Sequence, residues 1–155
     1  MKSREILYRR AAPDEAEAVA AIARTSRAHF LPYLPDLHSL EEAQAFFRNV
    51  VFQDCEVWVA EDPNAPAGQT LLGFCAFRDN WVDHLYLRPE HVGRSHGKAL
   101  LNKAMERQNH LQLWVFQKNT KAIRFYKSNG FQLVRKTDGS TNEEKVPDAL
   151  YAWRK

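Results

Sequence analysis

The segment from Gly93 to Lys98 has the composition of a phosphate-binding loop that opens into a helix. Such a junction presents several free backbone N–H groups in one direction, and glycine lets the backbone approach a ligand closely. The basic side chains add positive charge. We therefore predict a pyrophosphate site with these candidate residues: Gly93, Arg94, Ser95, His96, Gly97 and Lys98. A polar turn with a glycine at the helix start is the alternative, because this spacing alone is weak evidence.

A second segment combines a capped helix with a tyrosine. Asn119 is a typical N-cap residue, and Gly130 is typical of a position just after a helix. Ala122, Ile123 and Tyr126 fall on one face of the helix between them. By itself, this pattern indicates an amphipathic helix whose tyrosine packs in the core.

The elements that position these segments follow from periodicity. Strands are expected at 6–10, 56–61, 70–77, 81–87, 111–116, 131–136 and around 150–153. Helices are expected from Pro13, after the Ser39–Glu42 capping box, from Gly97, and over 119–129, and 29–35 is expected to be a loop. The sequence thus predicts an α/β protein of the α+β type. Its mixed, mostly antiparallel sheet of six to seven strands is flanked by about four helices in the order β-α-α-β-β-β-α-β-α-β-β. Strands 81–87 and 111–116 flank a helix and should be parallel neighbours.

The composition is that of a single globular domain spanning 1–155. The formal net charge of +3 suits a small anionic ligand but does not indicate nucleic-acid binding. Neither a leader at Met1–Glu5 nor a membrane span of about 20 apolar residues is expected. Cys55 and Cys75 favour buried thiols in a reducing compartment. We therefore expect a cytoplasmic protein without a metal site.

Three segments together resemble the GNAT superfamily of acetyl-CoA-dependent N-acetyltransferases. They are Leu85–Glu90, Gly93–Lys98 and the pattern from Asn119 to Phe131, in this order and at this separation. The family's loop pattern is Gln/Arg-x-x-Gly-x-Gly/Ala, and the sequence departs from it at Val92 and Ser95. A positive φ at Ser95 would cost on the order of 1 kcal/mol.

The resemblance implies acetyl-CoA as a co-substrate. Its pantetheine arm would lie along strand 81–87, beside Leu85, Tyr86 and Leu87, and Asn119 would also contact it. Tyr126 would protonate the leaving sulfur or donate a hydrogen bond to it. A free alkyl amine with a pKa of ~10 must lose a proton before it attacks. Asp83 is the favoured base and His84 the second candidate.

Strand alternation predicts that Trp81, Asp83, Leu85 and Leu87 share one face, with Val82, His84 and Tyr86 on the other. The acceptor is expected between the loop 30–38, the strand around Asp83, and the loop 142–147, where Glu143 and Glu144 could hold an ammonium group.

The resemblance therefore implies transfer of an acetyl group to a primary amine of a small molecule or peptide. The alternative is a non-catalytic acyl-CoA-binding regulatory domain. The expected partner is the amine acceptor, and binding to nucleic acid or to a membrane is not expected. A homodimer is possible.

Overall fold

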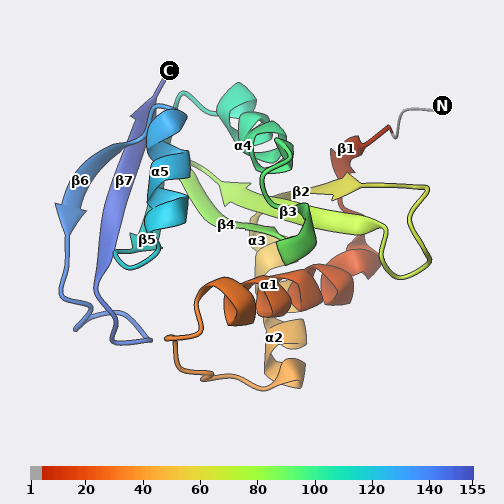
Figure 1. The fold of residues 1–155 in the computed structure, drawn as a ribbon, viewed down its shortest axis with the longest axis horizontal. Helices are drawn as coiled ribbons and strands as arrows, with labels where there is room; N and C mark the ends of the chain where they lie inside the picture. Colours follow the sequence, from red (N-terminus) through yellow and green to blue (C-terminus); the bar gives the residue numbers. More distant parts are fainter. Residues whose placement is uncertain (1–4) are drawn as a thin grey trace.

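The computed structural model describes residues 5–155. The expectation of no leader rests largely on residues 1–4, which lie outside the described residues. Seven strands form one sheet in the order β1-β2-β3-β4-β5-β7-β6 (Figure 1). The strands are β1 (Leu7–Arg10), β2 (Glu56–Glu61), β3 (Leu71–Arg78), β4 (Trp81–Leu87), β5 (His110–Phe116), β6 (Gln132–Lys136) and β7 (Asp148–Arg154). Every pairing is antiparallel except β4 with β5, which confirms the predicted mixed sheet.

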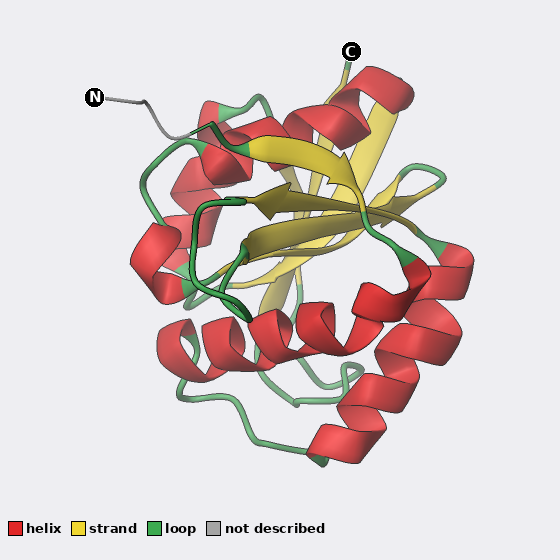
Figure 2. Cartoon of the chain, turned by 90° about the vertical axis from the view of Figure 1, so that its right-hand side faces the viewer, coloured by secondary structure: helices red, strands yellow, loops and turns green. Residues whose placement is uncertain are grey.

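Helices cover both faces of this sheet (Figure 2). The α-helices are α1 (Ala16–Phe30), α2 (Leu40–Phe46), α3 (Phe52–Asp54), α4 (His96–Arg107) and α5 (Thr120–Ser128). A π-helical turn, η2 (Phe47–Val51), joins α2 to α3, and short 3-10 turns lie at η1 (Pro13–Glu15) and η3 (Pro89–His91). One core cluster packs α4 and α5 against one face, and a second packs α1 and η2 against the other.

Local signals explain where the helices begin. The Ser39 hydroxyl accepts a hydrogen bond from the Glu42 N–H at 3.1 Å, and the Glu42 carboxylate accepts from the Ser39 N–H at 3.1 Å, which confirms the capping box. The expected loop at 29–35 is wrong at its start, because α1 continues through His29 and Phe30. Their edge-to-face ring contact, with centroids 4.7 Å apart, lies within the last turn of α1.

Strands β4 and β5 diverge soon after they meet. Trp81 and Gln112 are their paired residues, and the Gln112 N–H also donates to the Asn80 carbonyl at 2.8 Å. Beyond this point the described strands have no further ladder pair, so the edge of β4 is left open toward β5. The parallel neighbourhood that the sequence predicts is confirmed, although contact is limited to this one end.

A β-bulge at Asp83 breaks the alternation of β4. Ala76 pairs with His84 and Phe77 pairs with Val82, so Asp83 is the additional residue. Val82 consequently packs with Leu85 in the α4–α5 core, whereas His84 faces the α1 side. The predicted alternation is correct for His84 and Leu85 but wrong for Val82, because the extra residue shifts the phase.

Candidate functional site

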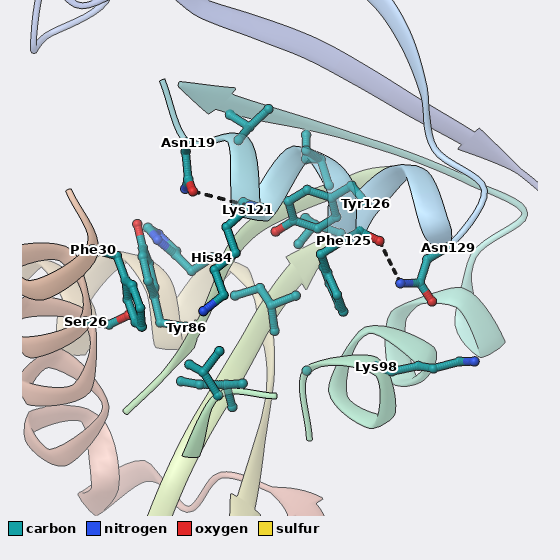
Figure 3. A pocket seen from close by; sticks show the side chains of 18 of the residues that line it. Ser26, Phe30, His84, Tyr86, Lys98, Asn119, Lys121, Phe125, Tyr126 and Asn129 are labelled. Carbon is teal, nitrogen blue, oxygen red and sulfur yellow. Dashed lines mark hydrogen bonds between the residues drawn. The ribbon is translucent and has the colours of Figure 1, made fainter. Parts of the chain in front are cut away.

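A cavity of about 630 Å³ opens where β4 and β5 diverge, between α1, α4 and α5 (Figure 3). It gathers most of the site residues that the sequence predicts. Those that line it are Asp83, His84, Leu85, Tyr86, Leu87, Gly93, Ser95, Gly97, Lys98, Asn119 and Tyr126. Segments more than 30 residues apart in the sequence therefore converge on one space.

The loop before α4 bends through two residues with positive φ. Gly93 has a φ of +85° and Ser95 a φ of +68°, and Ser95 is the N-cap of α4. Since α4 begins at His96, the N–H groups of its first turn have no carbonyl partner within the helix. Gly97 and Lys98, in that turn, line the cavity. A Cβ at Gly97 would lie 3.4 Å from Phe125 and 3.6 Å from Leu87. Glycine therefore lets the α4 backbone lie close to these two side chains.

Two residues of this loop do not line the cavity. His96 is buried, and its Nδ1 lies 2.9 Å from the Tyr8 hydroxyl on β1. Burial lowers the pKa of His96, with smaller contributions from His91 and Arg94. Arg94 is exposed and lies outside the lining. Within the loop, therefore, Gly93, Ser95, Gly97 and Lys98 form the wall, and His96 anchors α4 to β1.

The positive φ at Ser95 leads to a stability prediction. Ser95→Gly is expected to raise the free energy of unfolding by about 0.5–1 kcal/mol, because glycine adopts this backbone conformation without a Cβ penalty. Urea unfolding measures the change. Asn80→Gly is the matched control, since Asn80 has a φ of +63° in the β3–β4 turn. Asparagine tolerates this region better, so its gain should be smaller. An unchanged or reduced stability of Ser95→Gly would contradict the strain at this position.

Helix α5 brings Asn119 and Tyr126 to the cavity. The Asn119 side-chain oxygen accepts a hydrogen bond from the Ala122 N–H at 3.3 Å, which confirms the predicted N-cap. Tyr126 is 9% exposed, and its ring makes edge contacts with Phe125 and Phe131 at centroid distances of 5.3 and 5.6 Å. Its side chain points from α5 toward β4 (Figure 3). Burial raises the pKa of the Tyr126 phenol, so the hydroxyl keeps its proton at neutral pH.

The two candidate bases on β4 lie in different surroundings. Asp83 accepts hydrogen bonds through Oδ2 from Arg78 Nε at 2.6 Å and from the Cys55 thiol at 3.5 Å. His84 forms no hydrogen bond within residues 5–155. It lies among four aromatic rings at centroid distances of 5.3 to 6.4 Å, from Phe46, Phe47, Phe74 and Tyr86. Burial lowers the pKa of His84 to about 4, although Asp83 opposes the shift, so its imidazole is neutral at pH 7.

The shifted pKa of His84 makes the fold sensitive to acid. The folded pKa, about 4, lies below the unfolded value of 6.5, so the unfolded chain binds more protons between these limits. The free energy of unfolding is therefore unaffected by His84 above pH 6.5 and decreases as the pH falls toward 4. The His84 contribution is on the order of 2 kcal/mol. We expect His84→Gln to lose less stability than the wild type between pH 7 and pH 4.5 in urea unfolding, with His110→Gln as the control. Equal losses in wild type and His84→Gln would contradict this effect.

The loop 137–147 is tied to α1 and to the segment that follows it. Arg27 pairs with Glu144 at 2.8 Å, and His38 Nε2 lies 2.5 Å from the Glu143 carboxylate. Glu143 and, to a lesser extent, Glu42 raise the pKa of His38. The two carboxylates that the sequence suggested for an ammonium group thus already have partners in the chain.

Sequence reasoning assigned no role to three cavity-lining residues of α5 and its C-cap. Lys121, Phe125 and Asn129 line the cavity at intervals of four residues, so they share one face. The Lys121 Nζ lies 5.4 Å from the Phe30 ring centroid, and Asn129 Nδ2 donates to the Phe125 carbonyl at 2.8 Å. The four-residue spacing is the signal that could have identified this face, next to the apolar face that the sequence does predict.

Two further kinds of feature are absent from residues 5–155. No group of three or more His, Cys, Asp or Glu residues is arranged to hold a metal ion within this range. No helix in the same range has both the length and the apolar character that crossing a membrane requires.

Comparison with known proteins gives consistent matches. Residues 53–133 match the family described as the acetyltransferase (GNAT) domain. The peptidyl-lysine N-acetyltransferase YiaC of Escherichia coli is 31% identical over 107 residues, which cover 68% of each chain. The apo-form solution structure of YjaB from Escherichia coli has a TM-score of 0.75 at 23% identity, over 96% of this chain and 97% of that one. Arabidopsis thaliana NAA60 in complex with acetyl-CoA has a TM-score of 0.74 at 23% identity, over 97% and 98% of the two chains.

Proposed function

Because the chain belongs to the GNAT family of acetyl-CoA-dependent N-acetyltransferases, we propose that it acetylates a primary amine of a small molecule or peptide by direct attack. The observation that carries this proposal is the cavity at the divergence of β4 and β5. One side of it offers unpaired amides at the start of α4, and the other offers the protonated Tyr126 hydroxyl.

The coenzyme has a natural path along this cavity. Its pyrophosphate would lie on the N–H groups of residues 96–98, where the helix dipole also favours an anion. Lys98 adds a positive charge at that end. The pantetheine arm would pair with the main chain at Leu85 and Leu87, as an added strand does at an open sheet edge. Tyr86 lies between them, and Asn119 borders the far side. This path brings the thioester to the bulge at Asp83.

The chemistry then needs three groups. The amine nitrogen attacks the carbonyl carbon, and the new C–N bond forms while the carbonyl oxygen gains negative charge. A main-chain N–H near the bulge would stabilise this oxyanion. The C–S bond then breaks, and Tyr126 would give its proton to the leaving sulfur. The attacking nitrogen loses its proton to a base on β4, for which Asp83 is the first candidate and His84 the second.

The name of one relative suggests a class of acceptor. YiaC is a peptidyl-lysine N-acetyltransferase, and a lysine side chain is a primary amine on an alkyl arm. We therefore place lysine-containing peptides first among the acceptors to test. Thiol release from acetyl-CoA would be followed with such peptides, with N-terminal amines and with small amines, and the acetylated product would be identified by mass.

Two results would contradict the proposal. Calorimetry that detects no binding of coenzyme A or acetyl-CoA at millimolar concentration would remove the coenzyme site. Coenzyme binding without thiol release from any amine would favour a regulatory acyl-CoA-binding domain.

A further inference from the structure

A second hollow adjoins the coenzyme cavity across β4. It has a volume of about 610 Å³ and lies between the η2–α3 segment and the first half of β4. Its lining residues are Phe46, Val50, Val51, Asp54, Cys55, Arg78, Asp83 and His84. Asp83 and His84 also line the first cavity, so the two hollows meet at the bulge. Here "amine hollow" denotes this second space.

The charges in the amine hollow do not cancel. Asp54 and Asp83 contribute two carboxylates, whereas Arg78 contributes one guanidinium, which already pairs with Asp83. Asp54 is exposed and forms no hydrogen bond or ion pair with any part of the chain that the structure describes. The hollow therefore has an excess negative charge that favours a cation.

The rim of the amine hollow is apolar. Phe46 and Val50 lie four residues apart on the α2–η2 helix, and they are 45% and 41% exposed. Large side chains exposed next to a hollow are typical of a binding site rather than of a free surface. Aliphatic carbons could pack against them while a charged end reaches the carboxylates.

The two hollows have opposite charge. Lys98 and Lys121 line the coenzyme cavity, and neither forms an ion pair within residues 5–155. These cations suit the phosphates of the coenzyme, whereas the amine hollow suits a positive partner. His84 lies between them as a neutral ring without a hydrogen-bond partner in the described chain. Glu143 and Glu144, which the sequence suggested for an ammonium group, line neither space and pair with His38 and Arg27.

We propose that the amine hollow binds the acceptor as an alkylammonium chain, with Asp54 holding the ammonium group and Phe46 and Val50 packing against its carbons. This inference rests on the proposed transferase function and names its acceptor site. The bound ammonium loses one proton to the Asp83 carboxylate, directly or through water. Its nitrogen lone pair then forms the C–N bond at the bulge, while the C–S bond breaks and the sulfur takes a proton from Tyr126. The acylated nitrogen gives its second proton to the Tyr126 phenolate, directly or through water, which leaves a neutral amide, and Asp83 releases its proton to solvent.

The first experiment measures acceptor kinetics in Asp54→Asn. With a lysine peptide as acceptor, KM is expected to rise about 5-fold or more, as for the loss of one partly exposed charge contact. The KM for acetyl-CoA should change less than 2-fold, since Asp54 does not line the coenzyme cavity. Asp14→Asn, an exposed carboxylate in η1, is the matched control. A second pair compares Val50→Lys, which should repel the acceptor, with Leu133→Lys on the exposed strand β6.

A binding experiment separates this inference from the transferase function. Pentylamine and pentanol have alkyl chains of the same length, and calorimetry should show that the wild type binds the charged amine more tightly than the alcohol. That preference should be lost in Asp54→Asn and kept in Asp14→Asn. If the wild type turns over lysine peptides and Asp54→Asn leaves both KM and this preference unchanged, the amine hollow is not the acceptor site and the transferase function stands. If no amine causes thiol release, the transferase function fails, and the alkylamine preference alone decides whether the hollow binds a cation.

Discussion

Replacing Tyr126 by phenylalanine is expected to lower kcat about 100-fold, because a positioned general acid contributes ~10²–10⁴-fold to such a step. The ring of Tyr126 packs against Phe125 and Phe131, and a phenylalanine ring at the same position would keep those contacts. The dissociation constant of acetyl-CoA should therefore change less than 3-fold, which corresponds to a change on the order of 0.6 kcal/mol in the free energy of binding. Steady-state thiol release and calorimetry measure the two quantities on the same preparation.

The matched control for this variant is Tyr151→Phe. Tyr151 is also a buried tyrosine, 3% exposed on β7, but it does not line the cavity. Its kcat should stay within 2-fold of the wild type, which corresponds to a change on the order of 0.4 kcal/mol in the activation free energy. A Tyr126→Phe enzyme with normal kcat would remove Tyr126 from the proton transfer. A parallel loss of coenzyme binding would instead assign the tyrosine to binding.

Gly73→Ala is expected to lower the free energy of unfolding by about 2 kcal/mol, because overpacking a filled site typically costs ~1–3 kcal/mol. A Cβ at Gly73 would lie 2.2 Å from Leu87 Cδ2 and 2.7 Å from the Tyr86 carbonyl oxygen. The leucine side chain can rotate, but the carbonyl belongs to the β3–β4 ladder and can move only with the strand. We expect a fall in Tm of about 4–8 °C, which calorimetry would measure.

Gly68→Ala is the matched control for that variant. Gly68 has a φ of +81°, and a Cβ there would have no atom within 4 Å. Its expected cost is therefore backbone strain alone, about 1 kcal/mol. Because Gly73 faces the part of β4 that lines the cavity, its variant should also bind acetyl-CoA more weakly than the Gly68 variant. Equal free energies of unfolding for the two variants would mean that β4 can shift to accommodate the Cβ without loss of stability.

Much of the fold could be predicted from local sequence. The bounds of β2 and β4 match the expected strands 56–61 and 81–87, because alternating side chains between turn residues define such strands at both ends. The capping box at Ser39 and the N-cap at Asn119 depend on neighbours three residues away, and both are confirmed. The resemblance implied a pantetheine arm along strand 81–87, and the structure leaves that edge of β4 without a ladder partner beyond Trp81.

Features that depend on a partner strand were not accessible from the sequence. The bulge at Asp83 exists only in register with Ala76 and Phe77, so a reading of β4 alone could not place it. His96 was expected at the coenzyme, but its direction is set by Tyr8, which lies 88 positions away in the sequence. The amine hollow likewise combines α2–η2 with β4.

The meeting of β4 and β5 at one end gives the sheet a seam. Strands β1 to β4 form one slab and β5 to β7 another, and between the slabs the ladder joins Trp81 to Gln112. A molecule bound along this seam would contact both parts of the sheet and stabilise them against separation. Coenzyme binding should therefore do more than occupy a cavity: it should slow amide hydrogen exchange in β4 and β5 together and make the two slabs unfold as one unit.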